Sequence, residues 1–331
     1  MDYEIIYGQD LIPGALPRDR TWSVVIAPPL RQRLQQRLGS GTRLHPVSDM
    51  EQSSLDTWVE NVEPADAVLG VGGGVALDAA KYLAWAKGWP LHLAPSVISV
   101  DAAFTDTVGV RCSGRVRYVG KVKPAAVLVD EKMILGAPAH INRAGAGDIL
   151  SIHTALWDWR LAAKRRGEAY NPEIASESAL LLQRLSDAAE EIARVTPEGI
   201  RTLVDLFTAE VELCDRFGSS RPEEGSEHFW AYNAEYLTGR GYVHGELVAL
   251  GIKLISALQG NGASRIGRLI DRLDIRWRPE QIGMTAEEVI ESLRTAKLYV
   301  EQENLPYSVL NERALDPQDA RQLVQNVFHG L

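Results

Sequence analysis

The chain has little of several features that would point to particular classes of protein. It contains only two cysteines, Cys112 and Cys214, in 331 residues; these are too few and too far apart for a disulfide framework and fit a reducing compartment. No run of ~20 apolar residues occurs, so no membrane span is expected. The net charge is −9, which argues against nucleic acid as a partner. The first residues, Met1 to Glu4, lack the positive charge of a signal peptide, so we expect a cytoplasmic protein.

The pattern of the chain predicts two domains of different class. Before residue 140, short apolar runs at 22–27, 67–71, 91–94 and 126–130 alternate with helical stretches at 30–38 and 75–87, which indicates a parallel, Rossmann-like sheet. After it, nearly everything has helical periodicity, including 148–165 and 172–194. We therefore expect an α/β nucleotide-binding domain over 1–140, an all-α domain over 141–331, and an active site in the cleft between them.

A glycine cluster, Gly72-Gly73-Gly74, lies between the second of these strands and a helix that contains Asp78 and Lys81. Strand, glycine turn and helix N-terminus form the arrangement that binds a diphosphate, because glycine lets the backbone approach and the helix dipole favours negative charge. The spacing is not that of the usual dinucleotide fingerprint, and a glycine triplet alone is equally consistent with a structural turn.

Small hydroxyl residues and one acid follow the third strand. In open parallel sheets ligands bind beyond the carboxyl ends of the strands, so this segment could donate hydrogen bonds to a phosphate or a nicotinamide, and Asp101 could bind substrate hydroxyls. A capped turn is the alternative. The hydroxyl candidates are Ser96, Ser99, Thr105 and Thr107.

Candidate metal ligands occur only in the second domain. Asp148 follows a glycine pair and is expected at the start of a helix, where it could be merely a cap. His228 and Tyr232 are four residues apart and should share a helix face. His244 precedes a glycine at the start of another apolar helix. An Asp and His ligands could hold a divalent ion such as zinc.

In the order and spacing of these motifs the chain resembles the sn-glycerol-1-phosphate dehydrogenases, which belong to the superfamily of glycerol dehydrogenase, iron-containing alcohol dehydrogenases and dehydroquinate synthase. The resemblance extends from about residue 60 to the C-terminal region. The residues that carry it are Gly72-Gly73-Gly74 with Asp78 and Lys81, Asp101, Gly147-Asp148, Ser226-Glu227-His228 and His244-Gly245-Glu246.

The resemblance implies an NAD- or NADP-dependent, metal-assisted dehydrogenase of a small phosphorylated polyol or ketone. We also expect a homo-oligomer. The glycine turn would bind the cofactor diphosphate, and Ser96, Ser99 and Thr105 would line the nicotinamide. Asp78 and Thr107 are further cofactor-binding candidates. Asp101 would contact substrate. Asp148 and His244 would be two of three ligands to a divalent metal, with zinc favoured over nickel or iron.

Two positions depart from the expected family pattern. Tyr232 stands where the pattern places a third histidine ligand, twelve residues before His244. Tyr232 could bind as phenolate, His228 could replace it, or the metal site could be weakened or lost. After the first strand, Ala27-Pro28-Pro29 provides no acid near the adenosine ribose, which leaves the choice between NAD and NADP open.

Two alternative functions share the fold. A sugar-phosphate cyclase of the dehydroquinate synthase type would have Glu at the position of Asp148 and lysines in 101–111; this chain has neither. A metal-free, repurposed member of the fold is supported only by Tyr232.

Overall fold

The computed structural model describes residues 3–17, 19–38 and 41–329. It divides the chain into two compact units that meet in sequence between Asn142 and Arg143. None of the helices among the described residues is long and apolar enough to cross a membrane.

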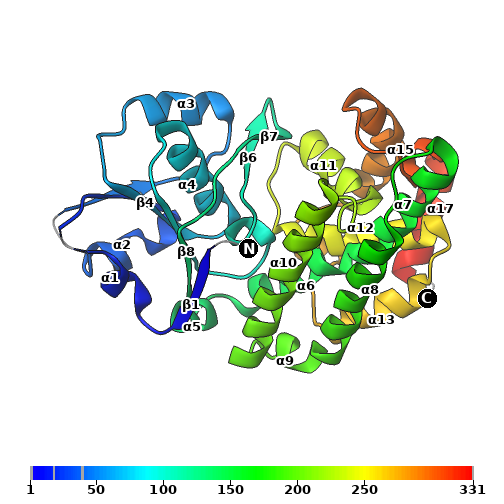
Figure 1. The fold of residues 1–331 in the computed structure, drawn as a ribbon. Coiled ribbons are helices and arrows are strands. Elements are labelled where there is room, and N and C mark those ends of the chain that lie inside the picture. The colour runs from blue at the N-terminus through cyan, green and yellow to red at the C-terminus, as the bar shows by residue number, and fades with distance from the viewer. Residues whose placement is uncertain (1–2, 18, 39–40, 330–331) are drawn as a thin grey trace. The chain divides into compact units, whose positions relative to one another are not determined.

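The first unit is built on a six-stranded sheet whose strands are all parallel (Figure 1). The strand order is β1-β8-β5-β4-β2-β3. The predicted Rossmann-like α/β class is confirmed, and the four predicted strands are the four central ones. The sequence analysis did not identify the two edge strands, which are only partly buried. The strands are β1 Glu4–Gly8, β2 Trp22–Ile26, β3 Thr42–Pro46, β4 Ala67–Gly72, β5 Leu91–Pro95 and β8 Ala126–Asp130.

Helices cover both faces of this sheet. On one face, Ile12, Leu34 and Met133 from three short helices pack against strand residues such as Val24 and Leu69. On the other face lies α4 (Gly74–Lys87), and a Cβ placed on Gly70 of β4 would be 2.7 Å from the Cβ of Ala80. Both faces of the central strands are therefore dry, which explains their continuous apolar sequences.

The remaining elements of the first unit are short. The predicted helix at 30–38 is a 3₁₀ turn, Pro28–Leu30, followed by α2. A separate antiparallel hairpin pairs β6 with β7. The elements are α1 Leu11–Ala15, α2 Arg31–Gln35, α3 Gln52–Glu60, α5 Glu131–Leu135, a 3₁₀ turn at Asp101–Ala103, β6 Thr107–Cys112 and β7 Arg115–Lys121.

The chain reverses its direction across the sheet between β2 and β4. These two strands are neighbours, but the chain continues from β2 outward to β3 and from β4 the opposite way to β5. A crevice forms beyond the carboxyl ends of two such strands, and this topological switch point is where open α/β sheets bind ligands. The loops after β2 and β4 begin at Ala27 and Gly73. The glycine cluster therefore lies at the expected place for a ligand.

The described part of the second unit contains helices only (Figure 1). The helices are α6 Ala139–Leu150, which begins just before the unit, α7 Ile152–Arg166, α8 Pro172–Asp187, α9 Ala189–Ala193, α10 Pro197–Phe217, α11 Ser226–Thr238, α12 His244–Gln259, α13 Ala263–Arg272, α14 Pro279–Ile282, α15 Ala286–Gln302, α16 Val309–Glu312 and α17 Pro317–His329. Thr196 caps the start of α10 and Thr285 that of α15, each with its hydroxyl accepting a backbone N–H.

Two details of the predicted helices are wrong. The segment 148–165 is divided between α6 and α7, so Asp148 lies in the last turn of α6 and not at the start of a helix. The two glycines in 144–148 are typical of a loop, whereas they lie inside α6. The segment 172–194 is likewise interrupted, by a turn at Ala188 between α8 and α9.

Candidate active site

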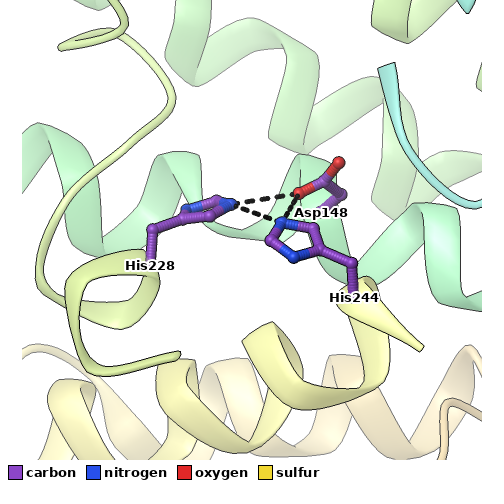
Figure 2. A group of neighbouring side chains, drawn as sticks. All are labelled: Asp148, His228 and His244. Atoms are coloured by element: carbon purple, nitrogen blue, oxygen red, sulfur yellow. Dashed lines mark hydrogen bonds and ion pairs between the residues drawn. The ribbon is translucent and has the colours of Figure 1, made fainter. Parts of the chain in front are cut away.

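Three helices of the second unit bring Asp148, His228 and His244 together (Figure 2). The Nε2 atom of His228 lies 3.2 Å from Oδ1 of Asp148 and 3.1 Å from Nε2 of His244. The Nε2 atom of His244 is 3.4 Å from the same Asp148 oxygen. Figure 2 shows the side chains pointing toward one another from α6, α11 and α12. Three donor atoms from residues far apart in the sequence thus converge on one point.

Glycines next to two of these residues let their helices approach closely. A Cβ on Gly147, beside Asp148, would lie 2.1 Å from the carbonyl oxygen of Gly245. A Cβ on Gly245, beside His244, would lie 1.8 Å from the carbonyl oxygen of Ala144. No side chain fits at either position, because the obstacle in each case is backbone. Gly147, directly before Asp148, and Gly245, directly after His244, therefore set the distance between α6 and α12.

Helix α11, which contains His228, is fixed at its first turn. Ser226 donates from its backbone N–H to Oδ2 of Asp158 at 2.9 Å, and its hydroxyl donates to the same oxygen. The backbone N–H of Val309 donates to the other oxygen of Asp158 at 2.8 Å. Burial raises the pKa of Asp158 to about 7, and the bonds from Ser226 oppose that rise only in part. This buried carboxyl group ties α7, α11 and α16 together behind the three-residue group.

The electrostatics of the group favour a carboxylate between two imidazoles. Burial works against the charged form of Asp148, but the imidazoles of His244 and His228 outweigh it and hold the pKa of Asp148 below its usual range. Burial also lowers the pKa of His228, yet the carboxylates of Asp148 and Glu227 together raise it well above its ordinary value. A cation is therefore favoured at this point, whether a proton or a metal ion.

The donor set fits a divalent metal ion. The group offers two imidazole nitrogens and one carboxylate oxygen, and these three atoms lie within 4.8 Å of one another. Zinc and related ions accept ligands of both kinds. The site is largely buried but open at one ligand: the side chains of His228 and Asp148 are 8% and 11% exposed, and that of His244 is 26% exposed. Three protein ligands are typical of catalytic zinc sites, whereas structural zinc sites use four.

Tyr232, the other sequence candidate, has a different partner. Its hydroxyl donates to Oε1 of Glu224 at 2.5 Å, and its ring centre is 6.0 Å from that of His228. Tyr232 and His228 share a face of α11, as the four-residue spacing predicted. Of the two, His228 is the residue that the fold brings to Asp148 and His244.

The glycine cluster forms the expected strand–turn–helix in the first unit. The strand β4 ends at Gly72, and α4 begins at Gly74 with Gly73 as its cap. Gly72 has φ +156°, and a Cβ on it would lie 2.7 Å from the Cβ of Ala76 and 2.9 Å from that of Ala27. The turn is therefore compact, and it leaves the N-terminus of a 14-residue helix at the switch point of the sheet.

The other candidates of the first unit lie after β5 and on β6. Ser96 is next to the turn, since its N–H donates to the carbonyl of Gly72 at 2.9 Å. Ser96 and Ser99 are nearly buried, and Asp101 begins a 3₁₀ turn. Thr105 accepts the N–H of Thr107 through its hydroxyl at 3.3 Å.

Asp78 and Lys81 have a structural partnership that the sequence did not reveal. The side chain of Lys81 is 1% exposed, and its ammonium lies 2.7 Å from a carboxylate oxygen of Asp78. It also donates to the carbonyl of Thr107 at 2.7 Å. The pair therefore joins α4 to the β6–β7 hairpin.

The sequence gives little indication of the residues that surround the three-residue group of Asp148, His228 and His244. It singles out Glu227 only as part of a motif, and Thr154 and Asp158 not at all. Glu227 accepts hydrogen bonds from Thr154 and from the backbone of Gly225. The one available signal was the position of Glu227 directly before His228; for Thr154 and Asp158 the sequence offered none.

Comparison with known proteins places this architecture in a family. Residues 10–138 match the family model described as iron-containing alcohol dehydrogenase. The glycerol-1-phosphate dehydrogenase [NAD(P)+] of Aeropyrum pernix is 30% identical over 325 residues, which cover 95% of this chain and 91% of the relative. The enzyme of the same name from Hyperthermus butylicus is 32% identical over 259 residues, 78% of this chain and 73% of the relative.

Solved structures agree at the level of the fold. A probable glycerol dehydrogenase from Sinorhizobium meliloti superposes with a TM-score of 0.73 at 18% identity, covering 98% of this chain and 96% of that one. The resemblance seen in the sequence is thereby confirmed: the chain belongs to the glycerol-1-phosphate dehydrogenase family of NAD(P)-dependent oxidoreductases.

Proposed function

We propose that this protein interconverts dihydroxyacetone phosphate and sn-glycerol 1-phosphate with NAD(H) or NADP(H), and that Asp148, His228 and His244 hold one divalent ion, with zinc the first choice. The observation that carries the metal assignment is the convergence of these three side chains from three helices. The names of the full-length relatives support the substrate. The metal-free alternative depended on Tyr232, and the position of His228 removes the need for Tyr232 as a ligand.

A metal ion held there would act as a Lewis acid toward the substrate oxygen, which lowers the barrier to hydride transfer at the adjacent carbon. The chain contributes the preorganised site. Asp148 supplies negative charge, the imidazoles of His228 and His244 supply neutral donors, and the glycine contacts between α6 and α12 hold the donors at fixed separations. Such fixed geometry spares the site the cost of reorganising during the reaction.

We assign the cofactor diphosphate to the N-terminus of α4. Backbone N–H groups without helical partners and the positive end of the helix dipole favour an anion there, and Gly73 and Gly74 leave the approach open. In the same assignment Ser96, Ser99, Thr105 and Thr107 bind the nicotinamide side, and Asp101 binds substrate hydroxyls. The residue after β2 is Ala27, so no carboxylate stands there to repel a 2′-phosphate. We therefore expect both NADH and NADPH to be used.

The test is reconstitution of metal-stripped protein. We expect about one zinc ion per chain by elemental analysis, and oxidation of NADH or NADPH that depends on zinc and on dihydroxyacetone phosphate. Unphosphorylated dihydroxyacetone should be a much poorer substrate. Product analysis with stereospecific glycerol-phosphate enzymes should detect the 1-phosphate.

A pair of histidine variants makes the metal assignment specific. His228→Ala should lose both the bound zinc and the activity, whereas His140→Ala, a histidine outside the three-residue group, should keep both. Zinc at wild-type stoichiometry and affinity in His228→Ala would contradict the assignment of His228. Absence of turnover in zinc-loaded wild type with either cofactor would contradict the proposed reaction.

A cytoplasmic homo-oligomer, expected from the sequence, remains part of this proposal. Light scattering of the purified, zinc-loaded protein would test the oligomer, and a monomer mass would contradict it.

A further inference from the structure

Glu227 directly precedes His228, a member of the three-residue group, and it is completely buried. Its side chain is 0% exposed. Its Oε1 atom lies 3.0 Å from Nδ1 of His228 and accepts the N–H of Gly225 at 2.7 Å. Its Oε2 atom accepts the hydroxyl of Thr154 at 2.6 Å. Thr154 and Gly225 thus donate hydrogen bonds to this carboxylate, and Nδ1 of His228 can donate one when it carries a proton.

These contacts decide which nitrogen of His228 carries a proton. The same Oε1 atom already accepts the N–H of Gly225, so it acts as an acceptor and Nδ1 is the donor toward Glu227. The other nitrogen, Nε2, is the one that lies beside Asp148 and His244. The bond to Glu227 thereby keeps the proton on Nδ1 and presents Nε2 to the ion.

The carboxylate of Glu227 is itself held from several sides. Thr154 belongs to α7, and its hydroxyl also lies 3.1 Å from the carbonyl of Ser151. A Cβ on Gly225 would be 2.8 Å from the Cα of Ala155, and a Cβ on Gly251 would be 2.9 Å from the carbonyl oxygen of Glu227. The close packing of α7 and α12 fixes the backbone of the first turn of α11, and the hydrogen bonds from Thr154 and Gly225 direct the carboxylate toward His228.

We propose that Glu227 is a positioning residue: it fixes the tautomer and ring orientation of His228 and so sets the metal affinity of the site. Carboxylates that hold a ligating histidine in this way affect metal affinity in other proteins by roughly 10–100-fold. The inference rests on the proposed function, because it requires that the three-residue group binds a metal ion.

Three variants separate positioning from simple packing. Glu227→Gln keeps an oxygen that can accept from Nδ1, while its amide can donate to the hydroxyl of Thr154, whose own proton can go to Ser151. Glu227→Met keeps the length of the side chain but removes the acceptor. Glu210→Gln is the matched control. Glu210 is a glutamate of α10 that is also buried, with 3% exposed, and it is not part of the three-residue group.

Zinc affinity is measured by competition with a chromophoric chelator, on protein whose folding is checked by circular dichroism. We expect Glu227→Met to bind zinc roughly 10–100-fold more weakly than wild type, and Glu227→Gln to lose only about threefold. Glu210→Gln should match wild type. A purely structural role for Glu227 would lower the melting temperature of metal-free Glu227→Met without changing the zinc affinity, and that result would overturn the inference.

A second measurement needs no variant of Glu227 and holds even if Glu227→Met fails to fold. In zinc-loaded protein with ¹⁵N-labelled histidine, the signals of His228 are assigned by their absence in His228→Ala. We expect Nδ1 to be protonated and Nε2 to be coordinated; coordination through Nδ1 would overturn the inference. If wild type binds no metal at all, the proposed function fails, whereas zinc binding that is independent of Glu227 refutes only the positioning role.

Discussion

Replacing Gly245 by alanine should separate two ligands of the site without touching either of them. The added methyl carbon would lie 1.8 Å from the carbonyl oxygen of Ala144 and 2.6 Å from its carbonyl carbon. Both are backbone atoms of α6, so no side-chain rotation can relieve the contact. Since ordinary contacts need more than about 3 Å, α12 must move away from α6 by about 1.5 Å.

The magnitude follows from the tolerance of metal ligation. Ligand distances in metal sites are held within about 0.2 Å, whereas His244 would shift by several times that amount relative to Asp148. We expect at least a roughly 100-fold loss of zinc affinity, with activity falling in parallel. Overpacking of this kind also costs about 1–3 kcal/mol of folding free energy, which for a protein of this size lowers the melting temperature by roughly 1–5 °C.

The assay is zinc titration of metal-free protein, with the melting temperature measured on the same samples. Gly241→Ala is the control. Gly241 is an exposed glycine of the loop that precedes α12, a Cβ added to it would meet nothing within 4 Å, and its φ is not positive; its substitution should change neither quantity. Wild-type zinc affinity in Gly245→Ala would refute the reasoning that the close contact of α6 and α12 sets the ligand geometry.

Three further outcomes are expected. The pKa of Asp158 is about 7 in the folded protein, whereas its ordinary value is 3.8. Between these two pH values the folded state binds more protons than the unfolded state. The free energy of unfolding should therefore fall by up to roughly 4 kcal/mol as pH rises from about 4 to 7, and then level off. Urea unfolding of metal-free protein should show that this dependence of the unfolding free energy on pH is lost in Asp158→Asn. An equal pH dependence in wild type and variant would contradict the raised pKa of Asp158. Gly72→Ala should weaken binding of NADPH, followed by fluorescence, by about tenfold or more because the new Cβ meets those of Ala76 and Ala27, while zinc content stays at the wild-type level; unchanged NADPH binding would argue against the turn as the diphosphate site. Tyr232→His should leave zinc affinity unchanged, because His228 already supplies the nitrogen, and a clear gain in affinity would show that the wild-type site lacks a ligand.

The central strands and the glycine turn were predictable because their signals are local. A strand buried on both faces must be mostly apolar, as β2, β4, β5 and β8 are, and a tight strand-to-helix turn needs glycine. The caps at Thr196 and Thr285 are local in the same sense, since a hydroxyl that accepts an N–H three residues later acts within one turn. The edge strands β1 and β3 gave no such signal because only part of each is buried.

The boundaries around Asp148 were not predictable from local rules. Glycines at 145 and 147 are typical of a loop, yet they lie within α6. The reason appears only in three dimensions, where Gly147 meets the backbone of Gly245 on α12. A residue that weakens an isolated helix is thus required by the packing of two helices.

By itself the sequence determined the class of each half of the chain, the glycine turn and the identity of most candidate ligands, because residue type and short-range spacing suffice for these. Tertiary structure decided which candidates meet. His228 and Tyr232 share a face of α11, but only the packing of α11 between α7 and α12 brings His228 to Asp148 and His244 and directs the hydroxyl of Tyr232 to Glu224. It also placed Glu227 against His228, Thr154 and Gly225. Such contacts depend on the distances between helices, which backbone approach at Gly147, Gly225 and Gly245 fixes and which no local pattern encodes.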